Sequence, residues 1–354
     1  MSRFFSSKYK NLEPYVPGEQ PRDMKYIKLN TNESPFEPSD AVKNAAAKEA
    51  GKLQLYSDPS LKSLCDAIAS RYGVMPSQVT AGNGSDEILN FSFMAFCDKA
   101  HPVCFPDITY GFYPVFAEIN GIPYKEIPLG NDFTVNYKDY CGINANIVIA
   151  NPNAPTGIAL ELWQIEEIVK TNPDNIVIID EAYVDFGAQS AVGLINKYDN
   201  IIVTQTFSKS RSMAGARLGF AVANEDIIND INTIRFSTNP YNVNRMTMEC
   251  GTAALEDNDY YMNNCKKIMS VREHTKSALE NLGFDVLPSQ ANFLFARSKY
   301  ISGKSLYEKL KKNGILIRHF DKDKIKDYNR ITIGTEEQMN TFINAVKKIT
   351  EDNI

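Results

Sequence analysis

Residues 175–209 read NIVIIDEAYVDFGAQSAVGLINKYDNIIVTQTFSK and contain two short apolar runs, each followed by a polar cluster. The first run ends at Asp180 and the second leads to Lys209. A third run, NIVIA at 146–150, comes before them, with helical spacing at roughly 160–171 in between. Runs that are apolar throughout are typical of strands covered on both faces. The pattern predicts an α/β fold with a mostly parallel sheet flanked by helices.

The 354 residues are too many for one compact core of usual size, so we expect two domains. Before the sheet come a proline-rich stretch at 1–35 and helical spacing at 39–50 and 60–72. After it we expect a long helix at 250–282, strands at 292–295, 315–318 and 330–333, and a helix near 303–312. A final helix begins with a capping box of Thr335 and Gln338 and has an apolar face of Met339, Phe342, Ile343 and Val346. The predicted units are an N-terminal arm (1–38), a large domain (39–248) and a small α+β domain (249–354).

Composition excludes several classes of partner. The net charge of −5 and the pI of about 5.5 favour neither nucleic acid nor an anionic membrane. No apolar run approaches membrane-spanning length, and residues 1–15 lack the apolar core of a signal peptide. The six cysteines are scattered without CxxC spacing. We therefore expect reduced thiols, no metal site and a cytoplasmic protein.

Polar clusters follow each of the three predicted strands, at 151–157, 180–183 and 206–209. Ligands of such sheets bind beyond the carboxyl ends of the strands. A desolvated lysine such as Lys209 can lose its proton and form a Schiff base with a carbonyl. Thr206, Ser208 and Arg217 would supply donors to a phosphate. Pyridoxal 5′-phosphate carries both an aldehyde and a phosphate, so these residues predict a site for that cofactor. The alternative interpretation is that the segment around Lys209 is an exposed Ser-Lys loop without a ligand.

Two further residues of the 180–183 cluster suit this cofactor. A carboxylate at the end of a buried strand needs a charged partner, and the protonated ring nitrogen would be that partner for Asp180. Alternatively, Asp180 binds a metal or caps a helix. Tyr183 is placed to donate to the cofactor's phenolic oxygen, or it is a buried tyrosine with a backbone partner.

The segment GNGSDEIL (82–89) predicts a helix N-terminus whose free amides bind phosphate. Gly84 and Ser85 would contribute amides, and Asp86 would cap the helix at the cofactor site because its charge repels phosphate. A plain N-cap is the alternative. Tyr110 could stack on a planar ring, although core packing is the default for an aromatic residue.

Nine motifs occur in the order seen in fold-type I aminotransferases. They are LNTNESP (29–35), LYSDP (55–59), GNGSDE (82–87), NPNAPTG (151–157), DEAYVDF (180–186), TFSKSRSMAGARLG (206–219), PYNVN (240–244), QANF (290–293) and NRITIGT (329–335). Across essentially its whole length the chain most resembles the histidinol-phosphate aminotransferase family. The resemblance implies a homodimer with shared active sites, in which the arm packs against the small domain and the partner.

The resemblance also implies a role for each site residue. Lys209 forms the Schiff base and shuttles a proton, Asp180 pairs with the ring nitrogen, Tyr183 bonds the phenolic oxygen and Tyr110 stacks on the ring. Gly84, Ser85, Thr206, Ser208 and Arg217 hold the phosphate, and Tyr56 reaches the phosphate of the neighbouring subunit's cofactor. Arg330 binds the substrate α-carboxylate, and Tyr15, Asn32, Asn242 and Arg318 line the side-chain pocket.

The chain departs from the family pattern in one place. Many relatives have a second asparagine that bonds the phenolic oxygen, where this chain has Ala154. We expect Asn153 to reach in instead; otherwise Tyr183 carries the contact alone. The bond before Pro155 is a candidate for a cis peptide.

The implied reaction transfers an amino group between histidinol phosphate and 2-oxoglutarate. Alternatives are an aromatic or broad-specificity aminotransferase and a threonine-phosphate decarboxylase. Decarboxylase relatives usually begin with a histidine-glycine-glycine motif, and the arm contains no histidine. A non-catalytic scaffold is disfavoured because Lys209, Asp180 and Arg330 are all present.

Overall fold

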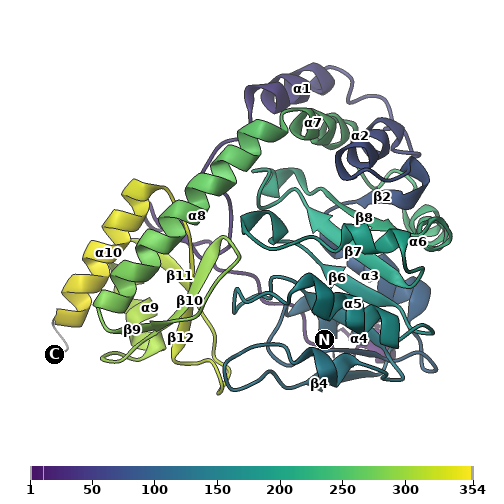
Figure 1. Ribbon diagram of the computed structural model, residues 1–354. Helices are drawn as coiled ribbons and strands as arrows, with labels where there is room; N and C mark the ends of the chain where they lie inside the picture. The colour runs from purple at the N-terminus through teal and green to yellow at the C-terminus, as the bar shows by residue number, and fades with distance from the viewer. Residues whose placement is uncertain (1, 11, 352–354) are drawn as a thin grey trace.

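The computed structural model describes residues 2–10 and 12–351, and its larger sheet has seven strands in the order β2-β8-β7-β6-β5-β3-β4 (Figure 1). The strands are β2 (Val79–Gly82), β3 (Val103–Pro106), β4 (Tyr124–Ile127), β5 (Asn146–Ala150), β6 (Val177–Asp180), β7 (Ile201–Thr206) and β8 (Gly219–Ala223). Only β8 runs antiparallel to its neighbours β7 and β2. The other pairings are parallel, so the prediction of a mostly parallel α/β sheet is confirmed.

Helices cover both faces of this sheet, which explains the continuous apolar runs. Ile147 and Ile149 of β5 belong to one hydrophobic core, while Val148 between them belongs to another on the opposite face. The helices are α1 (Asp40–Ala50), α2 (Lys62–Tyr72), α3 (Ser85–Phe96), α4 (Phe112–Asn120), α5 (Leu162–Thr171), α6 (Glu225–Thr238) and α7 (Arg245–Glu256). Short 3-10 helices lie at Ser7–Tyr9, Pro76–Gln78, Tyr137–Tyr140, Val184–Phe186, Val192–Asn196 and Ala214–Ala216.

The second sheet has five strands in the order β1-β11-β12-β10-β9. They are β1 (Ile27–Leu29), β9 (Phe284–Val286), β10 (Phe293–Ser298), β11 (Ile315–His319) and β12 (Tyr328–Thr332). Strand β1 pairs with β11 in parallel, so the N-terminal segment is part of this sheet. Helices α8 (Asn258–Asn281) and α10 (Glu336–Glu351) lie side by side against it, and α9 (Gly303–Lys312) completes the layer (Figure 1). The three-part division of the chain stays a prediction.

The prediction of one long helix at 250–282 is wrong, because α7 ends at Glu256 and α8 begins at Asn258. Asp and Asn side chains compete with helical backbone bonds, and the break falls at Asp257-Asn258. Arg211 fixes the junction by donating to the Ala254 carbonyl and to Asn258 Oδ1 at 3.4 and 3.2 Å. The capping box of α10 is confirmed: the Thr335 amide donates to Gln338 Oε1, and the Gln338 amide donates to Thr335 Oγ1.

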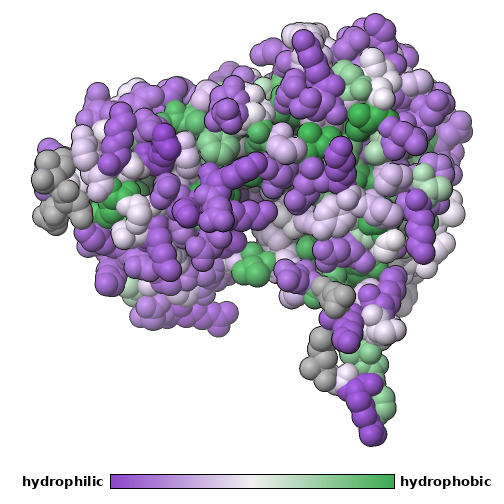
Figure 2. Space-filling view, turned by 90° about the horizontal axis from the view of Figure 1, so that it is seen from below, coloured by the Kyte–Doolittle hydropathy of each residue, from purple (hydrophilic) through white to green (hydrophobic). Residues whose placement is uncertain are grey.

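Hydrophilic side chains predominate on the face seen in Figure 2. No helix in the described part of the chain is long and apolar enough to cross a membrane. All six cysteines are free thiols.

Candidate active site

A cavity of about 480 Å³ opens between the two sheets, at the carboxyl ends of β5, β6 and β7. Many of the predicted residues line it: Tyr15, Asn32, Ser85, Asp86, Tyr110, Asp180, Tyr183, Thr206, Ser208, Lys209, Arg217, Arg318 and Arg330. The large sheet supplies Asp180 and Thr206 from strand ends, and the small sheet supplies Arg318 and Arg330 from β11 and β12. A ligand here would touch both sheets.

Asp180 is the last residue of β6 and only 4% exposed. Tyr113 Oη donates to its Oδ2 at 2.9 Å, and the Ala182 amide donates to its Oδ1 at 3.2 Å. Burial raises the pKa of Asp180 to about 6, because no cation among the described residues forms an ion pair with it. A cationic group of a ligand would complete this site.

Lys209 follows β7 and projects into the same cavity. Its Nζ donates to the Thr31 carbonyl at 3.2 Å and lies 5.8 Å from the ring centre of Tyr183. Burial, reinforced by the charge of Arg330, lowers the pKa of Lys209 to about 8. The amine is therefore easily made neutral and nucleophilic.

The N-terminus of α3 and the loop after β7 form an anion cradle. The side chain of Thr206 bonds to Ser208 Oγ at 2.9 Å, and Ser85 begins α3 opposite them. Gly219 lets the two elements approach closely, because a Cβ there would lie 2.2 Å from the Ser85 amide nitrogen. A Cβ on Gly84, whose φ is +85°, would meet the Arg217 guanidinium at 2.6 Å. Free amides and a guanidinium thus converge where a phosphate would bind.

Asp86 does not cap α3 as expected. The N-cap of α3 is Gly84, and among the described residues no side-chain cap bonds to the amides of the first turn. Instead Asp86 accepts from Arg217 Nη2 at 2.9 Å and from Tyr110 Oη at 2.7 Å. It therefore joins the cradle to the ring of Tyr110.

Arginines form the small-sheet wall of the cavity. Arg330 Nη2 donates to the Asn30 carbonyl at 3.0 Å, while its buried Nε has no hydrogen-bond partner in the part of the chain that the structure describes. Arg318 donates to the carbonyls of Pro17 and Val16. Within the described ranges neither guanidinium has an ion pair with a carboxylate, so this wall suits an anionic ligand.

Four predicted residues do not line the cavity: Gly84, Asn153, Asn242 and Tyr56. Gly84 lies directly behind the Arg217 guanidinium, which does line it. Asn153 turns away: its carboxamide bonds to Thr109, Thr156 and the Ile108 carbonyl, and its side chain lines a separate cavity. Asn242 donates to Glu87 Oε2 at 2.5 Å and does not line the cavity. Tyr56 is 77% exposed on the surface, with its ring stacked on Tyr241. Pro155 does line the cavity, and the peptide bond before it is cis, as is Asn151-Pro152.

Sequence reasoning missed Tyr113 and the carbonyls of Asn30 and Thr31. Tyr113 lies within PDITYGFY in the first turn of α4, whereas Tyr110 precedes that helix, so no helical spacing between the two tyrosines could have indicated it. The carbonyls carry no sequence signal, because every residue has one.

Comparison with known proteins places this geometry in a family. The model of the family "Aminotransferase class I and II" matches residues 24–346. A histidinol-phosphate aminotransferase of Brachyspira hyodysenteriae is 49% identical over 99% of this chain and 100% of its own, and one of Acinetobacter baumannii is 46% identical over 98% and 97%. The crystal structure of histidinol-phosphate aminotransferase from Sinorhizobium meliloti in complex with pyridoxal-5′-phosphate matches with a TM-score of 0.84 and 23% identity, over 93% of this chain and 92% of that one.

The chain therefore belongs to the class I and II aminotransferases. The predicted fold-type I architecture and the predicted aminotransferase class are both confirmed. Within this class, its relatives at 46–49% identity are histidinol-phosphate aminotransferases.

Proposed function

We propose that the protein is a pyridoxal-phosphate-dependent aminotransferase that transfers the amino group of histidinol phosphate to 2-oxoglutarate. The observation that carries the proposal is the buried, cation-free carboxylate of Asp180 facing the same cavity as Lys209. When bound, the cofactor supplies an aldehyde that takes up amino groups and a ring that withdraws electrons from the donor's α-carbon.

The residues present fit this group. Asp180 would hold a proton on the ring nitrogen, which supplies the cation that the carboxylate lacks. The α3 N-terminus, Thr206, Ser208 and Arg217 would hold the phosphate. Lys209 Nζ would bind the aldehyde carbon, would be displaced from it by the donor's amino group, and as a free amine would then move a proton at the donor's α-carbon. Tyr183 would donate to the phenolic oxygen alone, because the carboxamide of Asn153 is engaged elsewhere.

The arginine wall supports the choice of substrates. Histidinol phosphate is an amino alcohol whose phosphate ester stands where an amino acid has its carboxylate. Arg330, with Arg318 beside it, would bind that phosphate in one half-reaction and a carboxylate of 2-oxoglutarate in the other.

A homodimer completes the proposal. The exposed Tyr56 lies outside its own cavity, as expected of a residue that reaches the cofactor phosphate of a second copy. Phe4 and Phe5 of the arm are 81% and 50% exposed, which suits packing against that copy.

Purified protein supplied with pyridoxal phosphate should absorb visible light, and borohydride should fix the cofactor on Lys209. A donor panel with 2-oxoglutarate should give the highest kcat/KM for histidinol phosphate over phenylalanine, tyrosine and threonine phosphate. Label on another lysine, such as Lys170, would overturn the assignment of Lys209. A higher kcat/KM for phenylalanine or tyrosine would show that the donor is an aromatic amino acid instead of histidinol phosphate. Release of carbon dioxide from threonine phosphate would show that the reaction is a decarboxylation instead of a transamination.

A further inference from the structure

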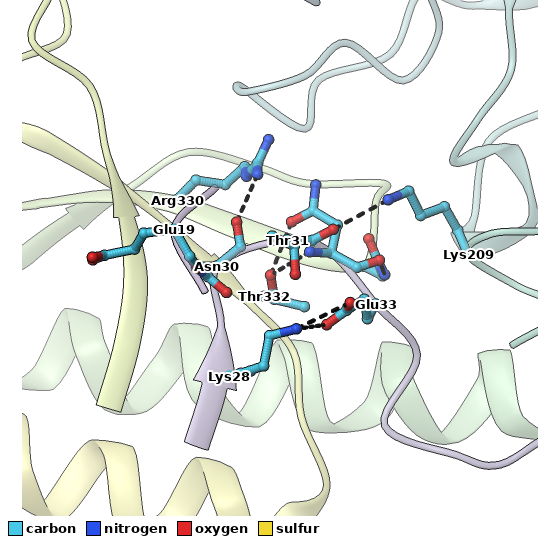
Figure 3. A network of polar contacts seen from close by, with 10 residues as sticks. Glu19, Lys28, Asn30, Thr31, Glu33, Lys209, Arg330 and Thr332 are labelled. Atoms are coloured by element: carbon cyan, nitrogen blue, oxygen red, sulfur yellow. Dashed lines mark hydrogen bonds and ion pairs between the residues drawn. The ribbon is translucent and has the colours of Figure 1, made fainter. Parts of the chain in front are cut away.

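Three consecutive residues of the arm each contact a different functional side chain. The Asn30 carbonyl accepts from Arg330 at 3.0 Å and the Thr31 carbonyl accepts from Lys209 at 3.2 Å (Figure 3). Asn32 Nδ2 then donates to the Tyr183 hydroxyl at 2.8 Å. Asn32 was expected in the substrate pocket, but this contact ties it to the side chain that would hold the cofactor's phenolic oxygen.

Asn32 is held rigidly in place. It is 1% exposed, and its φ of +57° is a left-handed conformation that asparagine tolerates better than most residues. Its amide donates to Thr332 Oγ1 at 3.0 Å, and its carbonyl accepts from Asn292 Nδ2 at 3.0 Å. Both partners belong to the small-sheet unit, so the carboxamide is aimed at Tyr183 by residues far away in sequence.

The hydrogen-bond network determines which way the carboxamide points. Thr332 Oγ1 accepts from the Asn32 amide, so its own proton is free to be donated to Asn32 Oδ1 at 2.9 Å. Reversing the carboxamide would set its NH₂ group against Thr332 and leave the threonine proton without an acceptor. The NH₂ group therefore faces Tyr183.

This orientation assigns the Tyr183 hydroxyl its role. Its oxygen accepts from Asn32, and its proton has no acceptor among the residues described. Because Tyr183 lines the cavity, that proton is available to an oxygen of a ligand. Burial raises the pKa of Tyr183, so the phenol keeps its proton at neutral pH.

We propose that Asn32 is a positioning residue that forces Tyr183 to donate to the cofactor's phenolic oxygen. The inference rests on the proposed function. Donation stabilises negative charge on that oxygen, and this charge is least compensated when the nitrogen linking Lys209 to the cofactor has lost its proton. Asn32 thus lowers the pH at which that nitrogen deprotonates.

The test is a pH titration of the visible absorption band of the holoenzyme in Asn32→Asp, Asn32→Gly and Tyr183→Phe. An aspartate side chain has the same shape as asparagine, but its ionised oxygens only accept hydrogen bonds. The Tyr183 hydroxyl would then donate its proton to that carboxylate in the Asn32→Asp variant and not to the cofactor. Asn32→Asp and Tyr183→Phe should each raise the midpoint by about one to two pH units, the range expected for losing a hydrogen bond to a charged group. Asn32→Gly tolerates the left-handed backbone and should give a smaller rise. Asn32→Gly in a Tyr183→Phe background should add nothing.

The charged groups facing Tyr183 are Lys209, Arg330, Asp180 and Asp86, and Glu33 and Arg217 also act on Lys209. Asn32→Gly and Tyr183→Phe leave the other charges unchanged, whereas Asn32→Asp adds a carboxylate whose charge alone also raises the midpoint, so the glycine variants separate the hydrogen bond from the charge. An unshifted midpoint in Asn32→Asp, or additive shifts in the double variant, would overturn the inference while the proposed function stands. So would a raised KM for the donor with an unchanged midpoint, which is what a substrate-pocket role predicts. A wild-type protein with no visible band would overturn the proposed function itself. If Asn32→Asp fails to fold, as thermal unfolding would show, the glycine variants decide.

Discussion

At the scale of single residues, Asp180 carries a charge that the protein without a ligand does not balance. Burial raises its pKa from 3.8 to about 6, so the carboxyl of Asp180 binds its proton more tightly in the folded chain than in the unfolded chain. Stability from this group is fully present below the unfolded pKa and is lost as the pH rises through about 6. Asp180→Asn should therefore make the apoprotein more stable by roughly 1–3 kcal/mol above pH 6, with the difference vanishing near pH 4. Denaturant unfolding of both proteins across this range measures it.

The same variant should lose most of its turnover, because an amide cannot hold the ring nitrogen protonated. Asp174→Asn, at an exposed position before β6, is the matched control and should change neither property. Near-normal kcat in Asp180→Asn would show that this carboxylate is structural.

Arg330→Ala tests the anion-binding wall. The Arg330 guanidinium forms no ion pair within the described chain. Its removal therefore weakens binding of the substrate anion and leaves no protein carboxylate unpaired. We expect kcat/KM to fall for both histidinol phosphate and 2-oxoglutarate, by an amount equivalent to roughly 2–5 kcal/mol. Steady-state kinetics with each substrate varied in turn give the two values. Arg330→Lys keeps the charge and should recover part of the loss. An effect confined to the donor would place Arg330 in the side-chain pocket instead.

At the scale of elements, the contact between β8 and α3 fixes the anion cradle. A Cβ on Gly219 would lie 2.2–2.7 Å from backbone atoms of Gly84 and Ser85, and neither element can yield without moving. Gly219→Ala should lower the free energy of unfolding by about 1–3 kcal/mol and weaken cofactor binding, since the amides of α3 shift. Gly193→Ala, where a Cβ meets nothing within 4 Å, is the control. Cofactor titration of the apoproteins measures the affinity. An unchanged affinity in Gly219→Ala would show that the amides of α3 do not bind the cofactor phosphate.

How far the sequence predicts these elements depends on how local their signals are. The runs at 146–150, 175–180 and 200–204 contain strands as predicted, because three or four consecutive apolar residues indicate burial on both faces of a sheet. The break at Asp257 was missed because helical spacing on both sides outweighed one weak local signal. Asn153 and Asn242 were predicted at the cavity from the motifs at 151–157 and 240–244, and only the first of these supplies cavity residues, Ala154 and Pro155. Their side chains are turned away by long-range partners, Thr109 and Glu87, which no local pattern reveals.

At the scale of the whole molecule, the position of Tyr56 points to a site shared between two chains. Arg245 Nη1 donates to the Tyr56 carbonyl at 2.9 Å, and the ring stacks on Tyr241 with centroids 4.4 Å apart, so this exposed side chain is held in place. A residue fixed outward, away from its own cavity, can serve a cofactor only in another copy. A two-fold dimer would then have two sites, each built from both chains.

Mixing two variants tests this arrangement. Lys209→Ala and Tyr56→Phe homodimers should both be impaired, the second less so. A mixed dimer with one mutation in each chain contains one site with both lesions and one with neither if Tyr56 acts across the interface. Its activity should therefore exceed that of Lys209→Ala homodimers and approach half of wild type after subunit exchange. If Tyr56 acts within its own chain, each site of the mixed dimer keeps one lesion. The activity then cannot exceed half that of Tyr56→Phe homodimers, and the shared-site arrangement would be wrong.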